Sequence, residues 1–188
     1  MSARGAPERG TPVRVVLEPM RPRDMPAVLD IEAAVYPRPW SPRVFADELA
    51  QRRSRVYRVA RVGRTIVGYA GLMLVQDDAH VNNIAVAPEW QGRGIATVLL
   101  VELVRVAADR RACDLTLEVR VGNDRAIALY QRFGLAPVGV RPGYYEETGE
   151  DALIMWARGI GSEAYARRVD GIVLALPEDL SVRWGPTR

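Results

Sequence analysis

Two glycines in a short polar segment, Gly92 and Gly94, are well placed to hold a phosphate group. They lie between an apolar, β-rich run that ends at Val86 and a helix that the pattern predicts from about Ile95. Glycine allows positive φ and close backbone approach, and the first N–H groups of a helix have no intrahelical acceptor. The loop amides and the helix dipole therefore predict a pyrophosphate site, with Arg93 in reach of a phosphate.

The spacing of this loop excludes two familiar nucleotide sites. A dinucleotide fingerprint needs glycine three positions after Gly94, where the chain has Thr97. A P-loop needs a lysine, and all 26 basic residues of the chain are arginine. On these residues alone, a glycine-rich turn that binds no ligand stays open as the alternative.

Composition narrows the class of protein. With 188 residues, 48% of them hydrophobic and 26% charged, the chain is expected to form one soluble globular domain with short extensions. The single cysteine, Cys113, and the single histidine, His80, exclude an internal disulfide and a Cys- or His-rich metal site. We therefore expect no metal and a reducing, cytoplasmic setting. We also expect no membrane partner, because no signal peptide is visible and no apolar run approaches the ~20 residues of a membrane helix.

Periodicity and Gly/Pro punctuation predict a mixed α/β fold over residues 13–158. Residues 1–12 read as a flexible tail, and residues 159–188 as an extension of unknown role in which 172–176 could be a strand. Two consecutive hairpins predict an antiparallel meander before the phosphate loop. The expected strands are 13–17, 55–61, 65–75, 80–86, 113–119, 136–140 and 151–156, and the expected helices begin near residues 25, 42, 95 and 124.

Several short strings then establish a resemblance. The segment Q-G-R-G-I-A, residues 91–96, resembles the coenzyme A loop of the GCN5-related N-acetyltransferases, and the element order is similar to their fold across about residues 13–158. The chain resembles the RimI-type N-terminal acetyltransferases more closely, through six strings that follow one another in the same order as in that family. They are P-W-S, N-I-A-V-A-P, L-E-V-R-V-G-N, A-I-A-L-Y, Y-Y and E-D-A. The chain departs at Ala96, where glycine is common, and at Phe133-Gly134-Leu135, where the family usually has Leu-Gly-Phe.

The resemblance implies a fold and an activity. The fold is a mixed central sheet with an antiparallel N-terminal meander, a β-α-β acetyl-coenzyme A site and helices on both faces. The activity is transfer of acetyl from acetyl-coenzyme A to the α-amine of a protein N-terminus, typically a ribosomal protein that starts with Ala, Ser or Thr. An acetyltransferase for lysine side chains or small amines, and a coenzyme A-binding module without turnover, are the alternatives. The net charge of +3 is weak support for RNA binding, and we expect no specific nucleic-acid partner.

The resemblance also assigns the catalytic pair to Glu118 and Tyr130. An α-amine with a pKa of about 8 must lose a proton before it attacks, and Glu118 falls on the family's general base. Glu118 lies mid-strand among apolar neighbours, so burial should raise its pKa; an ion pair with Arg120 on the same strand face is the alternative. Tyr130 falls on the general acid that protonates the leaving thiolate, and a packed tyrosine with a satisfied hydroxyl is its alternative.

The remaining predicted site residues surround these two. Ile84, Ala85 and Val86 should end a strand where its parallel neighbour splays away, which frees backbone groups for the donor. The full set of expected donor ligands is Ile84, Ala85, Val86, Gly92, Arg93, Gly94, Ile95, Ala96, Thr97 and Asn123, although Asn123 could instead cap a helix. The expected acceptor-binding residues are Tyr36, Trp40, Tyr144 and Tyr145, although Tyr36 and Trp40 could instead only pack two helices together. His80 and Cys113 are interpreted as packing residues, with His80 alternatively at the surface.

Overall fold

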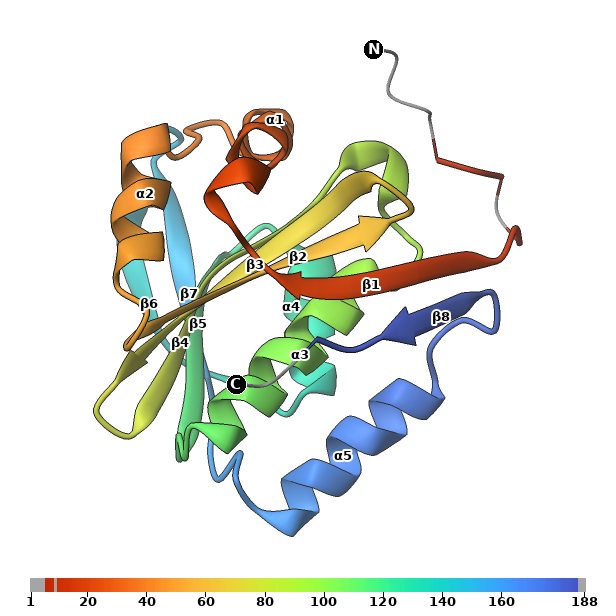
Figure 1. The fold of residues 1–188 in the computed structure, drawn as a ribbon. Coiled ribbons are helices and arrows are strands. Elements are labelled where there is room, and N and C mark those ends of the chain that lie inside the picture. Colours follow the sequence, from red (N-terminus) through yellow and green to blue (C-terminus); the bar gives the residue numbers. More distant parts are fainter. Residues whose placement is uncertain (1–5, 9, 186–188) are drawn as a thin grey trace.

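One eight-stranded mixed sheet forms the centre of the computed structural model, which describes residues 6–8 and 10–185 (Figure 1). Its order is β6-β7-β5-β4-β3-β2-β1-β8. Strands β1, β2, β3 and β4 are antiparallel neighbours in chain order, which confirms the predicted meander. Two pairs are parallel, β4 with β5 and β1 with β8. The strands are β1 (Val13–Pro19), β2 (Arg55–Val62), β3 (Thr65–Val75), β4 (Asp78–Val86), β5 (Asp114–Arg120), β6 (Ala136–Tyr145), β7 (Glu150–Ala157) and β8 (Leu180–Arg183).

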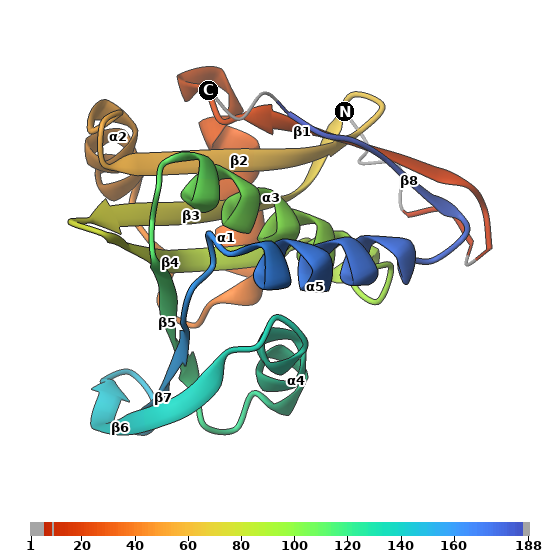
Figure 2. The same ribbon diagram turned by 90° about the horizontal axis from the view of Figure 1, so that it is seen from below.

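Helices cover both faces of this sheet, as expected (Figure 2). They are α1 (Met25–Val35), α2 (Pro42–Ala50), α3 (Ile95–Asp109), α4 (Asp124–Arg132) and α5 (Glu163–Leu174). Successive residues of a strand point to opposite faces. In β3, Tyr69 contacts Glu32 of α1, whereas a side chain at Gly68 would meet Leu99 of α3. The two helices therefore lie on opposite sides of β3.

Helix α3 is the most buried helix of the fold. Its side chains at Leu99, Leu100 and Leu103 have no exposed surface, because the sheet covers one side of the helix and α5 packs against another. A helix that is apolar nearly all round needs such cover on more than one side. This burial holds the first turn of α3, and the glycine loop before it, against the sheet.

The C-terminal extension is part of the fold, and the strand expected at residues 172–176 is wrong. Ser162 caps α5 by accepting from the Tyr165 N–H, and the helix continues to Leu174. Tyr165, Val169 and Ile172 are buried at helical spacing, so packing against α3 decides the helical period. After α5, β8 pairs in parallel with β1, with Val13 opposite Leu180.

Part of the segment expected to be a tail also contacts the domain. Arg93 donates a hydrogen bond to the carbonyl of Pro7, and the Gly10 N–H donates to Asp179 Oδ2 at 3.2 Å. The expectation for residues 1–5 and 9 lies outside the described residues. The described part of the N-terminal segment thus lies beside β8 and the glycine loop.

Candidate active site

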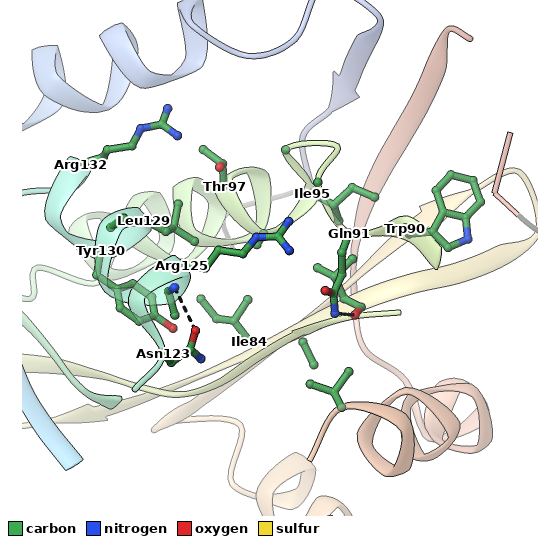
Figure 3. Close-up of a pocket in the computed structure, with 18 residues that line it drawn as sticks. Ile84, Trp90, Gln91, Ile95, Thr97, Asn123, Arg125, Leu129, Tyr130 and Arg132 are labelled. Atoms are coloured by element: carbon green, nitrogen blue, oxygen red, sulfur yellow. Dashed lines mark hydrogen bonds between the residues drawn. The ribbon is translucent and has the colours of Figure 1, made fainter. Parts of the chain in front are cut away.

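Strands β4 and β5 separate where the site begins. They pair only over Asp78–His80 and Asp114–Thr116, and beyond His80 each strand continues without the other. The divergence leaves a cavity of about 400 Å³ lined by the end of β4, the glycine loop, the first turn of α3 and helix α4 (Figure 3). The expected splaying of parallel strands at Ile84–Val86 is therefore confirmed.

The glycine loop presents unpaired donors to this cavity. Gly92 and Gly94 have φ of +78° and +82°, and Gly94 is the residue from which α3 starts. Within the described part of the chain, the N–H groups of Gly92, Arg93 and Gly94 donate to no other backbone group. Together with the open first turn of α3, they form a cradle for an anion.

Arg93 does not line this cavity. Its guanidinium bonds to the Pro7 carbonyl and lies 5.7 Å from the Trp90 ring centroid. The cations that line the cavity are instead Arg125 and Arg132, from the two ends of α4. Figure 3 shows Arg125 extending toward Gln91 and Ile95. Sequence reasoning missed both, although their spacing of two helical turns on α4 places them on one face.

The end of β4 offers fewer free backbone groups than expected. The Ile84 carbonyl accepts from the Tyr36 hydroxyl at 3.0 Å, and the Val86 carbonyl accepts from Gln91 Nε2 at 3.0 Å (Figure 3). In an antiparallel ladder the N–H and C=O of one residue point to the same side. The N–H groups of Ile84 and Val86 therefore face the gap left by β5, whereas Ala85 directs its backbone groups toward β3.

Asn123 adopts the alternative role. Its Oδ1 accepts from the Ala126 N–H at 3.1 Å and caps α4 (Figure 3). Its side-chain amide makes no hydrogen bond to the described residues and faces the point where the two cavities of the site meet. The residue can therefore cap the helix and still donate to a ligand.

A second cavity of about 710 Å³ adjoins the first. It is lined by the α1–α2 segment, by β4 and β5 beyond their separation, and by the end of β6. The residues that line both cavities are Val35, Ile84, Asn123, Ala126 and Tyr130. A group held in the first cavity can thus meet a group held in the second beside the Tyr130 hydroxyl.

Glu118 lines the second cavity, and its carboxylate lies between the side chains of His80 and Arg141. Its Oε2 is 3.1 Å from His80 Nε2, and its Oε1 is 3.0 Å from Arg141 Nη1. The hydrogen bond from His80, helped by the charge of Arg141, lowers the pKa of Glu118 despite its burial. The expected rise in pKa is wrong, because partners on β4 and β6 outweigh desolvation.

The alternative ion pair of Glu118 with Arg120 is also absent from the described residues. Arg120 instead pairs with Glu147 and with Glu150, whose Oε2 lies 3.0 Å from its Nη1. It also lies 3.8 Å from the Tyr145 ring centroid. Arg120 therefore orders the loop between β6 and β7 and leaves Glu118 to the cavity.

Tyr130 is half-buried at the junction of the cavities. Burial, with the nearby Tyr145, raises the pKa of Tyr130 to about 12, so its hydroxyl is protonated at neutral pH. The hydroxyl makes no hydrogen bond to the described residues, so it is not the satisfied packing tyrosine of the alternative. It remains free to donate to a bound group.

Aromatic side chains line the second cavity. Trp40 packs on Phe45 with ring centroids 5.5 Å apart, and Tyr144 meets Tyr145 edge-on at 5.1 Å. Tyr36 lines the cavity too, but its hydroxyl is bound to Ile84. The cavity therefore brings together all four predicted acceptor residues with Glu118 and Tyr130.

Comparison with known proteins identifies the family. The model of the Acetyltransferase (GNAT) family matches residues 25–135. The N-alpha-acetyltransferase RimI of Mycobacterium tuberculosis is 41% identical over 133 residues, which cover 69% of this chain and 82% of that protein. The chain belongs to the GNAT acetyltransferase family. It is an acetyl-coenzyme A-dependent N-acetyltransferase, because that is the donor the family implies.

Two further comparisons, one of sequence and one of structure, support the assignment to the GNAT family. The [ribosomal protein bS18]-alanine N-acetyltransferase of Escherichia coli K12 is 36% identical over 134 residues, covering 70% of this chain and 89% of that protein. The crystal structure of the Escherichia coli ribosomal-protein-S18-alanine N-acetyltransferase matches with a TM-score of 0.71 and 31% identity, over 77% of this chain and 94% of that one. The GNAT fold expected from the sequence is thus confirmed.

The donor cavity of this GNAT chain fits acetyl-coenzyme A. Its glycine cradle is suited to anions, two arginines of α4 supply positive charge, and apolar side chains line the cavity along with Tyr130. When bound, acetyl-coenzyme A supplies the acetyl group and the thiolate leaving group. The described residues contain no cluster of three His, Cys, Asp or Glu side chains suited to a metal ion. They also include no helix long and apolar enough to cross a membrane.

Two side chains that line the acceptor cavity, His80 and Glu32, were given no part in the site by the sequence reasoning. His80, interpreted as a packing or surface residue, lines the cavity with its Nε2 3.1 Å from Glu118 Oε2. Glu32 is buried against Trp40 and Tyr69, and desolvation raises its pKa to about 7. Cys113, expected in the core, is exposed just before β5. The partners of His80 and Glu32 lie on other elements, so no local motif marks these two residues. The only sequence signals are that His80 is the single histidine and that Glu32 stands among the apolar residues of α1.

Proposed function

We propose that this chain acetylates the N-terminal α-amine of a ribosomal protein, with N-terminal alanine of bS18 as the substrate suggested by its relatives. A ribosomal substrate would place the reaction in the cytoplasm. The observation that carries the proposal is the junction of the two cavities. There Tyr130 lies between a cradle suited to a phosphorylated donor and an acidic, aromatic chamber suited to an ammonium group.

The proposed donor ligands follow from this geometry. The amides of Gly92, Gly94 and the first turn of α3, residues 95–97, would hold the pyrophosphate. The N–H groups of Ile84 and Val86 would contact the donor's arm, and one of them would polarise the reacting carbonyl. The Asn123 amide would add a donor at the junction. Arg93 is left out, since it is occupied by Pro7.

The acceptor chamber would attract and then deprotonate the amine. Glu118 is ionised at neutral pH because its pKa is lowered, so it offers negative charge to the incoming ammonium. The ammonium proton would leave on the Glu118 side of the chamber, where His80 also lies. Tyr130, which lines both cavities and is protonated, would donate its hydroxyl proton to the leaving sulfur. The aromatic walls at Tyr36 and Trp40 would exclude water from the chamber.

A peptide panel tests the proposal. Each peptide would begin with alanine, serine or another residue, carry a free or blocked N-terminus, and contain or lack an internal lysine. Mass spectrometry would locate the acetyl group, and Tyr130→Phe enzyme would be the matched control. Label confined to free N-termini, with alanine preferred, is the expected result. Label on lysine side chains, or on a small amine alone, would replace the proposal with the second activity class.

A further inference from the structure

His80 and Glu118 meet at the point where β4 and β5 stop pairing. His80 is the last residue of β4 in register with β5, opposite Thr116, and Glu118 is two positions further along β5 on the same face. Their facing side chains place Nε2 and Oε2 3.1 Å apart. The exposed fractions of these side chains are 24% for His80 and 13% for Glu118. The pair thus lines the acceptor cavity at the mouth of the divergence.

The two oxygens of Glu118 are both engaged. Oε2 lies 3.1 Å from His80 Nε2, within hydrogen-bond distance, and Oε1 accepts from Arg141 at 3.0 Å. A carboxylate with two such donors is stabilised in its charged form and is a weak proton acceptor. The neighbouring imidazole of His80, which lines the same cavity, is therefore better suited than Glu118 to take a proton.

The second ring nitrogen of His80, Nδ1, is available to accept a proton. If Nε2 carries the proton that it gives to the Glu118 carboxylate, Nδ1 keeps its lone pair. Nδ1 makes no hydrogen bond to the described residues, and the side chain lines the cavity in which the acceptor amine would sit. An anionic partner on Nε2 also stabilises the imidazolium that forms when Nδ1 takes a proton.

We propose that His80 is the general base of this enzyme. The Glu118 carboxylate orients the imidazole and stabilises its protonated form. The inference rests on the proposed function, because it needs an ammonium in the acceptor cavity. One proton passes from the ammonium nitrogen to His80 Nδ1, the freed lone pair of the amine can then attack, and the imidazolium returns the proton to solvent.

Substitution of His80 by glutamine separates this proposal from direct catalysis by Glu118. The Nε2 of a glutamine can still donate to Glu118, but the side chain has no basic nitrogen. We expect His80→Gln to lower kcat by roughly 10²-fold, with the KM for acetyl-coenzyme A changed less than about twofold. If Glu118 itself takes the proton, removal of the imidazole leaves kcat unchanged or higher, and the proposal fails.

Two further kinetic arms test the coupling of the pair. His80→Gln/Glu118→Gln should be about as slow as His80→Gln alone, since residues that act as a unit are non-additive. Independent, multiplying losses would contradict a dyad. In His80→Ala, added imidazole should restore part of kcat, whereas the same imidazole should leave Glu118→Ala unaffected. Absence of rescue in a folded His80→Ala enzyme would indicate a structural role.

The tautomer provides a readout without turnover. The chain has one histidine, so the ¹⁵N signals of its imidazole belong to His80 alone. We expect the neutral form of this ring in the wild-type chain to give the signal pattern of the tautomer that carries its proton on Nε2. A ring protonated at Nδ1 would overturn the assignment even if peptide acetylation is confirmed. Failure of peptide acetylation with the expected tautomer would instead count against the proposed function.

Discussion

The carboxylate of Glu32 accepts a hydrogen bond from the backbone N–H of Trp40 at 3.0 Å. Glu32 ends up buried in α1, while Trp40 lies in the segment that joins α1 to α2, so the bond fixes that segment over the acceptor cavity. The other oxygen of Glu32 accepts from the Tyr69 hydroxyl. A buried carboxylate thus connects the cavity wall at Trp40 with Tyr69 in β3.

Glu32→Gln should change how stability depends on pH. Burial raises the pKa of Glu32 from its ordinary value of 4.5 to about 7, so between these values the folded state binds the proton more strongly than the unfolded state. The stabilising contribution is complete below pH 4.5 and is lost as pH rises through 7. The loss is about 3 kcal/mol by linkage. Relative to wild type, the variant should gain stability from pH 5 to pH 8, as measured by urea unfolding; parallel curves would contradict this.

Gly94→Ala should weaken both the fold and donor binding. Gly94 has a φ of +82°, and a Cβ there would lie 3.1 Å from Leu180 Cδ2 and 3.2 Å from Pro177 Cδ. Strain and crowding should cost roughly 1–3 kcal/mol and raise the KM for acetyl-coenzyme A. Thermal unfolding and steady-state kinetics measure the two effects.

Gly171→Ala is the matched control for that substitution. Gly171 lies within α5, and a Cβ there would have open space around it. Alanine should stabilise the helix by roughly 0.5–1 kcal/mol and leave the KM for acetyl-coenzyme A as it is. An equal loss of stability in both variants would show that the backbone conformation at Gly94 is not special.

The order of strands and helices up to Trp156 was predictable because local signals agree there. Ser41-Pro42 marks the start of α2, and Gly94 marks the start of α3. The extension was misread because the apolar run from Ile172 to Leu176 has a strand-like composition. Only the burial of Tyr165, Val169 and Ile172 against α3, a long-range contact, selects the helix.

The sequence predicted which residues gather at the site better than it predicted their ion pairs and pKa shifts. The strings around Glu118 and Tyr130 indicated which residues gather at the junction of the cavities. The direction of the pKa shift at Glu118 was wrong, because His80 and Arg141 come from other strands and no local pattern announces them. The cation expected at Arg93 is likewise displaced by a contact with Pro7, 86 residues away in sequence.

Tyr130→Phe should remove activity without loss of stability. The hydroxyl is protonated at neutral pH and has no hydrogen-bond partner among the described residues, so its removal leaves no protein group unpaired. We expect kcat to fall by roughly 10²-fold or more while thermal unfolding stays close to that of wild type. Near-normal kcat would show that solvent, rather than Tyr130, protonates the leaving group.

Asn123 allows its two roles to be separated by two substitutions. Asn123→Ala removes the cap on the Ala126 N–H and should destabilise the chain by roughly 1 kcal/mol, with a higher KM for acetyl-coenzyme A. Asn123→Asp keeps an oxygen for the cap but loses the amide donor that faces the cavities. We therefore expect aspartate to restore thermal stability and not the KM. Recovery of both quantities would show that Asn123 serves the donor only by starting α4.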